Sequence, residues 1–483
     1  MNVNFAAIAP EVILTASLCA VLTADLFLQE DRKWLVMPLS FGGVLATLAA
    51  VIAISGQDAT TTLGGMFVVD RFAILFKGVF CLAALLVLAM SHDYLQDDRI
   101  HQGEYYTLLL SSLLGMLTIA SSRDLIAIFV SLELISLPAF VLAGLRKPDL
   151  RSNEAALKFF LFGVLSTAIM LFGMSLIYGV TRATNLNAIA EVLATEPVAR
   201  TVSVLAIIFV VAGFGFKISA FPFQWWVPDT YEGSPVPIAA FLSVASKTAG
   251  FVGLLQIMLI AFIDLSDIWR PIIGVVAVLT MTFGNVVAIQ QSNIIRMLAY
   301  SSIGQAGYIL LPLAVVTSSK AGITQDALVA STVYLLIYAF METGAFATAI
   351  AVGRRGGGYL TKDYSGLFSK APGLAVAMAV FLFSLAGVPP LAGWAAKFFV
   401  FKVVVSGGGI WLAVAMAVNT VIALFYYAAV VRRMFFDAPE TEGAFRTPAL
   451  LGGGIALAAV VVVLVGVLPD LFGRIASGTS LTF

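Results

Sequence analysis

The feature that most constrains this chain is a succession of apolar runs, most of about 20 residues, that fills it almost from end to end. A helix needs roughly 20 apolar residues to cross a hydrocarbon core of about 30 Å. Fourteen segments meet that requirement and are predicted to be membrane-spanning helices. They lie near 5–28, 34–55, 72–91, 105–120, 124–145, 154–180, 203–226, 236–262, 267–290, 294–316, 327–352, 373–404, 410–431 and 448–471. The connections are short, so the sequence predicts an all-α polytopic membrane protein without a sizeable extramembrane domain.

The composition agrees with this fold class and excludes several others. Hydrophobic residues make up 60% of the chain and charged residues 11%, against about 45–50% and 25% in soluble domains. Lys+Arg and Asp+Glu number 27 each, so no excess of positive charge indicates nucleic acid as a partner. Cys19 and Cys81 lie apart inside apolar runs, and His92 and His101 lie in a polar stretch. We therefore expect no disulfide framework, metal site or haem in this chain.

The positively charged residues of the loops predict the orientation in the membrane. No Lys or Arg precedes the first apolar run, so we expect an uncleaved helix there and not a secretory signal. Fourteen loop cations lie on the side of the first connection and seven on the other side. The fourteen are Arg32, Lys33, Arg99, Arg146, Lys147, Arg151, Arg296, Arg354, Arg355, Lys362, Lys370, Arg432, Arg433 and Arg446. This asymmetry predicts that both termini lie on the outer side of the membrane.

Six lysines and three acidic residues stand out among the charged residues of the predicted spans. They are Lys77, Lys158, Lys217, Lys247, Lys397, Lys402, Asp25, Glu133 and Glu342. A charged side chain near a helix centre costs about 2.5–3.5 kcal/mol on insertion scales. Lys77, Lys402 and Asp25 are expected near helix ends, where they can extend their charged groups toward the headgroups. Glu133, Lys217, Lys247 and Lys397 lie at mid-span or beside a helix break, where packing alone does not explain a charge.

A carboxylate and several lysines in one dry interior form interdependent proton sites. Burial disfavours the charged ammonium form, whereas a nearby carboxylate favours it. Moving or neutralising one charge therefore changes the proton affinity of the next site. Glu133 and Lys247 both lie about 14 Å or more into their predicted helices. The sequence thus favours proton transfer within the membrane.

Two predicted helices carry proline breaks beside a lysine. Pro222 follows Lys217 by five residues, and Pro389–Pro390 precede Lys397. Proline removes a backbone donor and frees carbonyl groups in mid-helix, which is tolerated in a membrane only beside protein or a water-filled cavity. Each break alone is also compatible with a kink that serves packing. Corresponding breaks in two halves indicate inverted repeats.

The predicted organisation therefore has four parts. Residues 1–104 form an N-terminal three-helix segment, and residues 105–262 a first inverted five-helix repeat that acts as a half-channel. Residues 263–431 form the second repeat and half-channel, and residues 432–483 hold the C-terminal helix. Each repeat contains one broken helix.

Polar side chains at helical spacing lie between these sites. The first stripe is Ser301, Gln305 and Tyr308, and the second is Tyr334, Tyr338 and Glu342. Either stripe is compatible with a hydrated track or with ordinary interhelical hydrogen bonding. Glu154 and Lys158 are four residues apart, which is the spacing of a helical ion pair.

Five stretches of the chain resemble the antiporter-like proton-channel subunits of respiratory complex I. They are DLIAIFVSLELISLPAFVLAG, RSNEAALKFFLFGVLSTAIMLFG, FKISAFPFQWWVPDTYEGSPVPIAAFLSVASK, IIRMLAYSSIGQAGY and FSLAGVPPLAGWAAKF. Within that family the opening APEVILTASLCAVLTADLF is similar to the member nearest the quinone module. Lys397, where a sister subunit typically has glutamate, and the absence of a long lateral helix after the last span favour the same member.

The resemblance implies roles for five residues. Glu133 and Lys217 match the family's Glu–Lys pair, and Lys247 matches the central lysine that connects the half-channels. Lys397 matches the lysine associated with exchange toward the outside, and Lys158 matches an additional lysine whose role is less settled. Gln224 and Gln305 depart from the pattern, because relatives often have histidine there. If that histidine relays protons in the relatives, water or another group must serve at Gln224, which cannot titrate.

The resemblance also implies partners and a reaction. The chain would be a subunit of a proton-translocating NADH:quinone oxidoreductase in a bacterial inner membrane. Flavin, iron–sulfur clusters and quinone would be bound by partner subunits, with no redox centre in this chain. Its neighbours would be lipid, a second antiporter-like subunit and the small subunits of the quinone module.

Three alternatives stay open. One is a subunit of a multi-subunit cation/proton antiporter, which shares the broken helices and lysines. Another is a relative from a membrane hydrogenase or a photosynthetic ferredoxin-driven complex. The third is a scaffold of the same fold that does not transport.

Overall fold

The computed structural model describes residues 3–97, 102–195, 200–354, 358–439 and 447–481. Arg99, His101, Arg355 and Arg446, which entered the sequence analysis, lie outside these residues. Twelve helices in the described part of the chain are long and apolar enough to cross a membrane. One of the other two predicted segments is α4 (Gln102–Ser121), which packs along α5 (Leu125–Ala143). The other is interrupted and forms α16 (Pro372–Ala386) and α17 (Ala392–Ser406). The chain is thus the multi-pass helical protein that was predicted.

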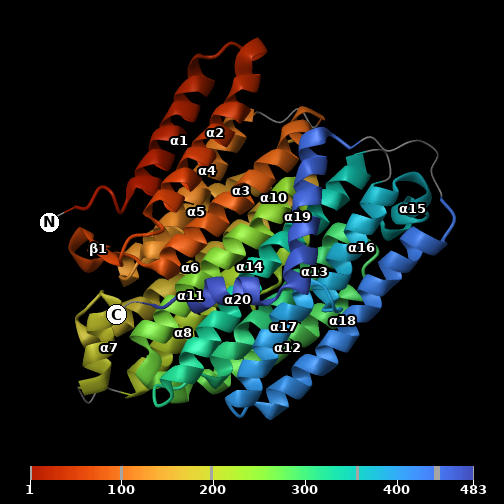
Figure 1. Ribbon diagram of the computed structural model, residues 1–483. Coiled ribbons are helices and arrows are strands. Elements are labelled where there is room, and N and C mark those ends of the chain that lie inside the picture. The colour runs from red at the N-terminus through yellow and green to blue at the C-terminus, as the bar shows by residue number, and fades with distance from the viewer. Residues whose placement is uncertain (1–2, 98–101, 196–199, 355–357, 440–446, 482–483) are drawn as a thin grey trace.

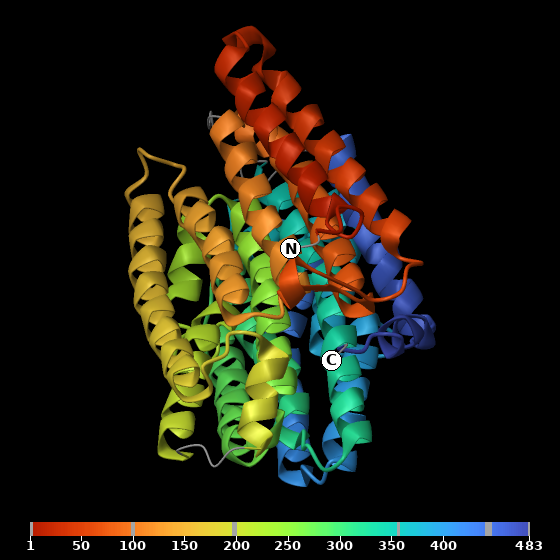
Figure 2. The same ribbon diagram turned by 90° about the vertical axis from the view of Figure 1, so that its left-hand side faces the viewer.

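The N-terminal segment is a helical hairpin followed by a third helix. Its elements are α1 (Ala9–Phe27), η1 (Glu30–Leu35), α2 (Val36–Ile54), β1 (Thr60–Thr62), η2 (Leu63–Gly65), β2 (Phe67–Val69) and α3 (Arg71–Asp97). The two short strands pair antiparallel, with Thr61 opposite Val68. Figures 1 and 2 show α1 and α2 projecting beyond the remaining helices. Only 22% of the apolar stretch of α1 is buried within the chain, so most of its surface is left to lipid or to another protein.

A buried ion pair holds α1 against α3. Lys77, which was expected near a helix end, is fully buried on α3. Its Nζ lies 2.7 Å from Oε1 of Glu11 on α1. The expectation that Lys77 extends to the headgroups is therefore wrong, because a carboxylate from the neighbouring helix compensates its charge.

We expect Glu11→Ala to destabilise the N-terminal segment, because it leaves the Lys77 ammonium buried without its counter-ion. Breaking a buried pair in this way costs about 3–5 kcal/mol. Removing both charges, as in Glu11→Leu with Lys77→Met, is expected to restore most of the loss. Thermal unfolding of the purified, detergent-solubilised protein with its partners measures both effects. Equal stability of the single variant and the wild type would contradict the role of the pair.

The next part of the chain contains the first broken helix. Its elements are α4, α5 (Leu125–Ala143), α6 (Leu150–Thr181), α7 (Leu186–Thr195), α8 (Arg200–Ile218), α9 (Trp226–Gly233), α10 (Val236–Phe241), η3 (Leu242–Ser246), α11 (Lys247–Gln256), η4 (Ile257–Ala261) and η5 (Ile263–Leu265). Helix α8 ends at Ile218 and α9 begins at Trp226, so the interruption includes Pro222. The break predicted at Pro222 is confirmed. Elements η3 and η4 are π-helical turns that flank α11 within one long span.

The following part repeats this arrangement. Its elements are α12 (Ser266–Ala288), α13 (Ile294–Leu310), η6 (Leu311–Val315), α14 (Ala321–Val352), η8 (Thr361–Tyr364), α15 (Leu367–Lys370), α16 (Pro372–Ala386), α17 (Ala392–Ser406) and α18 (Ile410–Phe436). Helix α16 ends at Ala386 and α17 begins at Ala392, which confirms the break predicted at Pro389–Pro390. The chain continues with α19 (Ala449–Val467) and α20 (Asp470–Ser477). Figure 1 shows both ends of the chain on the same side of the molecule.

The same local structure begins the second helix of each repeat. The side chain of Asp124 accepts a hydrogen bond from the backbone N–H of Ile126 at 2.9 Å, and Asn293 accepts one from Ile295 at 2.8 Å. These caps satisfy backbone donors at the start of α5 and α13. Each capping residue also forms an isolated β-bridge with the segment that follows the next helix, Asp124 with Asn185 and Asn293 with Leu360. Five predicted spans separate the two copies, an odd number, so the second copy runs in the opposite direction through the membrane.

Three helices form the centre of the molecule. The apolar stretch from α10 to η4 is 100% buried, and those of α13 and α14 are 89% and 94% buried. Helices α6 and α18 lie outside them, and only 33% and 39% of their apolar stretches are buried. Charges on the central helices are therefore surrounded by protein and not by lipid.

Candidate functional site

Lys217 lies in the last turn of α8, directly before the first break. Its side chain is 6% exposed, and its Nζ donates a hydrogen bond to Oγ of Ser136 on α5. The Ser136 hydroxyl itself donates to the carbonyl oxygen of Leu132, which leaves its lone pairs free to accept. The aromatic rings of Phe140 and Phe216 lie 5.9 and 5.4 Å from Nζ. Their π faces attract a cation in this otherwise apolar surrounding.

Glu133 lies on α5, one turn before Ser136. Its carboxylate interacts electrostatically with Lys217, but its Oε1 is buried with no hydrogen-bond partner among the described residues. The two side chains also form no ion pair within 4.0 Å. The direct Glu133–Lys217 contact that we expected is therefore not made in this conformation, because the Ser136 hydroxyl binds the ammonium group instead.

Gln224 lies inside the first break and is fully buried. Neither its Oε1 nor its Nε2 has a hydrogen-bond partner within the part of the chain that the structure describes. Buried amides are normally hydrogen-bonded to protein or to ordered water. Within the described residues, both side-chain atoms of Gln224 are therefore left without a protein partner.

Lys247 lies at the centre of the molecule, at the start of α11 and directly after the π-helical turn η3. Single π-helical turns inside helices occur frequently at functional sites. Its Nζ donates to the carbonyl oxygen of Ser302 at 2.9 Å and to the Ser302 hydroxyl at 2.8 Å. Gly250, one turn later, packs so closely on Lys217 that a Cβ at Gly250 would lie 3.0 Å from the Cβ of Lys217. Helix α11 therefore contacts the α8 lysine through Gly250 and α13 of the second repeat through Lys247.

The two predicted polar stripes face each other on α13 and α14. Tyr334 donates a hydrogen bond to Oε1 of Gln305 at 2.5 Å, and the rings of Tyr308 and Tyr334 stack with centroids 6.4 Å apart. Ser301 shares a hydrogen bond of 2.5 Å with Tyr427 of α18. Hydroxyl and amide groups thus continue from Ser302 toward the second break. These hydrogen bonds hold α13, α14 and α18 together.

Lys397 lies on α17, directly after the second break. Its Nζ donates to the carbonyl oxygen of Ala386 at 2.8 Å, which is the last residue of α16 and has no helical partner because the helix ends there. Gln305 donates to the preceding carbonyl, that of Leu385, at 3.1 Å. The Tyr308 ring lies 4.5 Å from Nζ. One freed backbone carbonyl at the break, that of Ala386, therefore holds the lysine.

Gly387 makes room for this lysine. Its φ of +89° is rarely adopted by residues with a side chain. A Cβ there would lie 2.8 Å from Cδ of Lys397. Glycine is thus required both for the turn that ends α16 and for the approach of the lysine to the carbonyl of Ala386.

Lys158 does not lie in the buried interior. Its side chain is 38% exposed, and its Nζ lies 2.6 Å from Glu154 and 2.6 Å from Asp229 of α9. The predicted Glu154–Lys158 pair is confirmed. Asp229 also binds Arg296 of α13 at 2.8 Å, and Arg296 binds Glu232 at 2.8 Å. Lys158 therefore belongs to a partly exposed charge cluster that joins α6, α9 and α13.

Asp229 lies outside the twelve long spans. Partial burial by itself would raise the pKa of its carboxyl, but hydrogen bonds and charges from Lys158 and Arg296 outweigh burial and lower that pKa. Asp229 therefore remains a carboxylate that bridges two cations from the two repeats.

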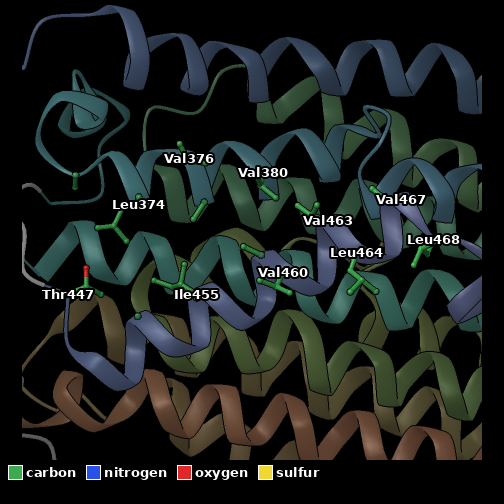
Figure 3. A pocket seen from close by; sticks show the side chains of 16 residues that line it. Leu374, Val376, Val380, Thr447, Ile455, Val460, Val463, Leu464, Val467 and Leu468 are labelled. Carbon is green, nitrogen blue, oxygen red and sulfur yellow. The ribbon is translucent and has the colours of Figure 1, made fainter.

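The large apolar cavity in Figure 3 lies elsewhere. It has a volume of about 940 Å³ and lies between α16 and α19, where Leu374, Val380 and Leu464 are among its lining residues. Its lining is aliphatic apart from Thr447. No titratable side chain is among its lining residues. Within the described residues, no cluster of three or more His, Cys, Asp or Glu side chains could hold a metal ion.

Comparison with known proteins identifies the family. Residues 122–423, which include all five candidate residues, match the family described as NADH:quinone oxidoreductase/Mrp antiporter, TM. The chain belongs to this family. A relative from Trichlorobacter lovleyi named NADH-quinone oxidoreductase subunit N is 41% identical over 91% of this chain and 89% of its own length. A second, from Streptomyces griseus and named NADH-quinone oxidoreductase subunit N 2, is 40% identical over 99% of this chain and 94% of its own length.

Solved structures support the same family. A chain of respiratory complex I from Thermus thermophilus with bound Aureothin superposes with a TM-score of 0.81 at 28% identity, over 97% of this chain and 100% of that chain. A chain of the Mrp complex from Dietzia sp. superposes with a TM-score of 0.86 at 21% identity, over 98% of this chain and 96% of that chain. Because the identity to the Mrp chain is only 21%, this match shows that the two chains share a fold and no more. The resemblance to antiporter-like subunits of complex I, and within them to subunit N, is confirmed.

Several members of this site were not among the predicted residues. Ser136 and Ser302 accept hydrogen bonds from Lys217 and Lys247, and nothing in the sequence distinguishes them from other helix serines. Asp229 and Arg296 had been counted only as polar or loop residues. Their charges could have been noticed in the sequence, because Asp229 follows the first break and Arg296 lies near the start of a predicted helix. Only the fold shows that the two side chains meet.

Proposed function

We propose that this chain carries protons across the membrane as an antiporter-like subunit of NADH:quinone oxidoreductase, through Glu133, Lys217, Lys247 and Lys397. One observation carries the proposal. Lys217, Lys247 and Lys397 are each at most 6% exposed. Among the described residues, no carboxylate oxygen lies within 4.0 Å of their Nζ atoms. A lysine without a carboxylate in direct contact is expensive in a membrane interior, at about 2.5–3.5 kcal/mol for each residue, so retention of three such lysines indicates a function.

The arrangement supports a path from one break to the other. Lys217 and Lys397 each lie beside a break, where backbone groups lack helical partners. Lys247 lies between them and is joined to the second repeat through Ser302. Each lysine is held by neutral serine or carbonyl oxygens, which can accept a hydrogen bond from the ammonium form without fixing its charge. A proton passed to one lysine repels a proton on the next, which gives the transfer a direction when the first site is filled from one side.

Lys158 has a different place in the proposal. Because it is partly exposed and paired with Asp229 and Glu154, it acts at the edge of the path, where protons exchange with water. The proposed parts of the chain are 1–104, the half-channels 105–262 and 263–431, and the C-terminal part 432–483.

The proposal includes partners and location. The relatives are named as subunits of an oxidoreductase, so we propose that neighbouring membrane-arm subunits, including a second antiporter-like subunit and small quinone-module subunits, surround this chain. Flavin, iron–sulfur clusters and quinone would be held by those partners and not by this chain. The membrane would be a bacterial inner membrane with both termini on its outer side.

Purification of the tagged full-length chain with its partners tests this assignment. We expect mass spectrometry to find flavin and iron–sulfur subunits, and vesicles to show proton uptake driven by NADH oxidation with no requirement for sodium. Recovery of antiporter subunits alone, together with sodium-dependent proton exchange, would instead establish the cation/proton antiporter. A chain that copurifies with the oxidoreductase but whose lysine variants pump at the full ratio would be a scaffold.

A further inference from the structure

A second buried carboxylate lies at the centre of the molecule. Glu342 is 0% exposed on α14, a helix whose apolar stretch is 94% buried. It was recognised in the sequence only as part of a polar stripe. A buried ionisable residue in a membrane protein is expensive and is commonly functional, so its surroundings are decisive.

The two oxygens of Glu342 have different surroundings. Oε1 accepts a hydrogen bond of 3.1 Å from the hydroxyl of Ser243, which lies in the π-helical turn directly before Lys247. Oε2 is buried and has no hydrogen-bond partner among the described residues. Ser243 also shares a hydrogen bond of 2.9 Å with Tyr338, in which the tyrosine hydroxyl donates because the single serine proton goes to Glu342. One oxygen is positioned, and the other is left available.

The charged and titratable groups around Glu342 are few. Lys247 is the cation with which it interacts electrostatically. Tyr338 of the same helix, Tyr231 of α9 and Tyr427 of α18 are the hydroxyl groups within electrostatic reach. Lys247 and Glu342 form no ion pair within 4.0 Å, because the lysine donates to Ser302 on the other side. The two groups therefore interact through space without being locked together.

We propose that Glu342 is a second proton-binding group of the central site and exchanges a proton with Lys247. This inference rests on the proposed function. In the transfer, the N–H bond of the Lys247 ammonium breaks, and an O–H bond forms at Oε2 of Glu342. The ammonium and carboxylate become an amine and a carboxylic acid, and the net charge of the pair is zero before and after. The transfer thus adds no uncompensated charge to the dry interior.

The pair also explains how a proton leaves the centre. When a further proton arrives at the lysine while Glu342 is protonated, the pair carries one net positive charge. That charge favours release toward the polar groups of α13 and α14, which lead to Lys397. A single lysine would have to pass between a charged and a neutral state without any compensating group.

The test is the variant Glu342→Gln in the fully assembled complex. It keeps the size and hydrogen-bonding capacity of the side chain but cannot bind a proton. We expect proton transfer to slow by about a hundredfold, at the lower end of what a positioned acid–base group contributes. Thr343→Val, a change at the next buried position of α14, is the matched control and should pump like the wild type. Wild-type pumping by Glu342→Gln would overturn the proposal.

Infrared difference spectroscopy during NADH-driven turnover separates proton binding from a structural role. We expect a carboxylic-acid C=O band in the wild type that is lost in Glu342→Gln and shifted in Glu342→Asp. If the Glu342→Gln complex does not assemble, the Glu342→Asp complex still tests the proposal. A C=O band at the wild-type position in Glu342→Asp would refute the assignment of the band to Glu342. Normal Glu342→Gln pumping beside impaired Lys247→Ala would overturn this inference alone. Normal pumping in both would overturn the proposed function as well.

Discussion

Lys247→Ala is expected to slow proton transfer through this chain by about a hundredfold or more, because it removes a buried proton-binding group whose hydrogen bonds join α11 to α13. The ammonium of Lys247 donates both to the carbonyl oxygen and to the hydroxyl of Ser302 on α13. The measurement is proton uptake by vesicles for each NADH oxidised, in complexes whose subunit content matches the wild type.

Two further variants make this result specific. Lys247→Arg should not restore pumping fully, because guanidinium has a pKa above about 12 and does not readily release its proton. Lys402→Ala removes an exposed lysine from α17 and should leave pumping unchanged. Wild-type pumping by the arginine variant would mean that a fixed charge is sufficient and that Lys247 is no proton carrier.

The second large effect is expected at Glu133 and Lys217. We expect Lys217→Ala to slow transfer by about a hundredfold, because it removes a proton carrier. Glu133→Gln should slow it by about tenfold, which corresponds to the loss of about 1.4 kcal/mol of electrostatic interaction. Glu133→Asp keeps the charge on a shorter side chain and should retain partial activity. Glu191→Gln, an exposed carboxylate on α7, is the control.

The structure adds a test of how this pair works. Lys217 binds Ser136 and not Glu133, so we infer that its ammonium moves between these two neighbours when the charge nearby changes. Ser136→Ala removes one of the two and should hold Lys217 beside Glu133, which slows transfer less than the loss of the lysine. Pumping at the wild-type ratio in both Glu133→Gln and Lys217→Ala would show that coupling does not depend on this pair.

The location of the charged residues was largely predictable, but their partners were not. Burial of Lys217, Lys247 and Lys397 followed from apolar sequence on both sides of each residue, and both helix breaks followed from proline. Lys77 shows where this reasoning fails. The sequence predicts that Lys77 lies near a helix end and reaches the headgroups. In the structure α1 brings Oε1 of Glu11 to 2.7 Å from the Lys77 Nζ, and the lysine is buried. Which acid meets which base depends on helix packing, and packing is not encoded in the periodicity of one helix.

The sequence by itself determined that this chain is a multi-pass helical protein, where its two helices break, and which charges must lie in the membrane. These properties depend on the length of apolar runs and on the backbone chemistry of proline, which act locally. Only the tertiary structure decided that Ser136 takes the place of Glu133 beside Lys217, that Ser302 receives Lys247, and that Glu342 shares the centre with it. Those contacts join residues 55 to 99 positions apart. Electrostatic and hydrogen-bond energies depend steeply on distances of a few ångströms between side chains of different helices, which the order of residues along the chain does not specify.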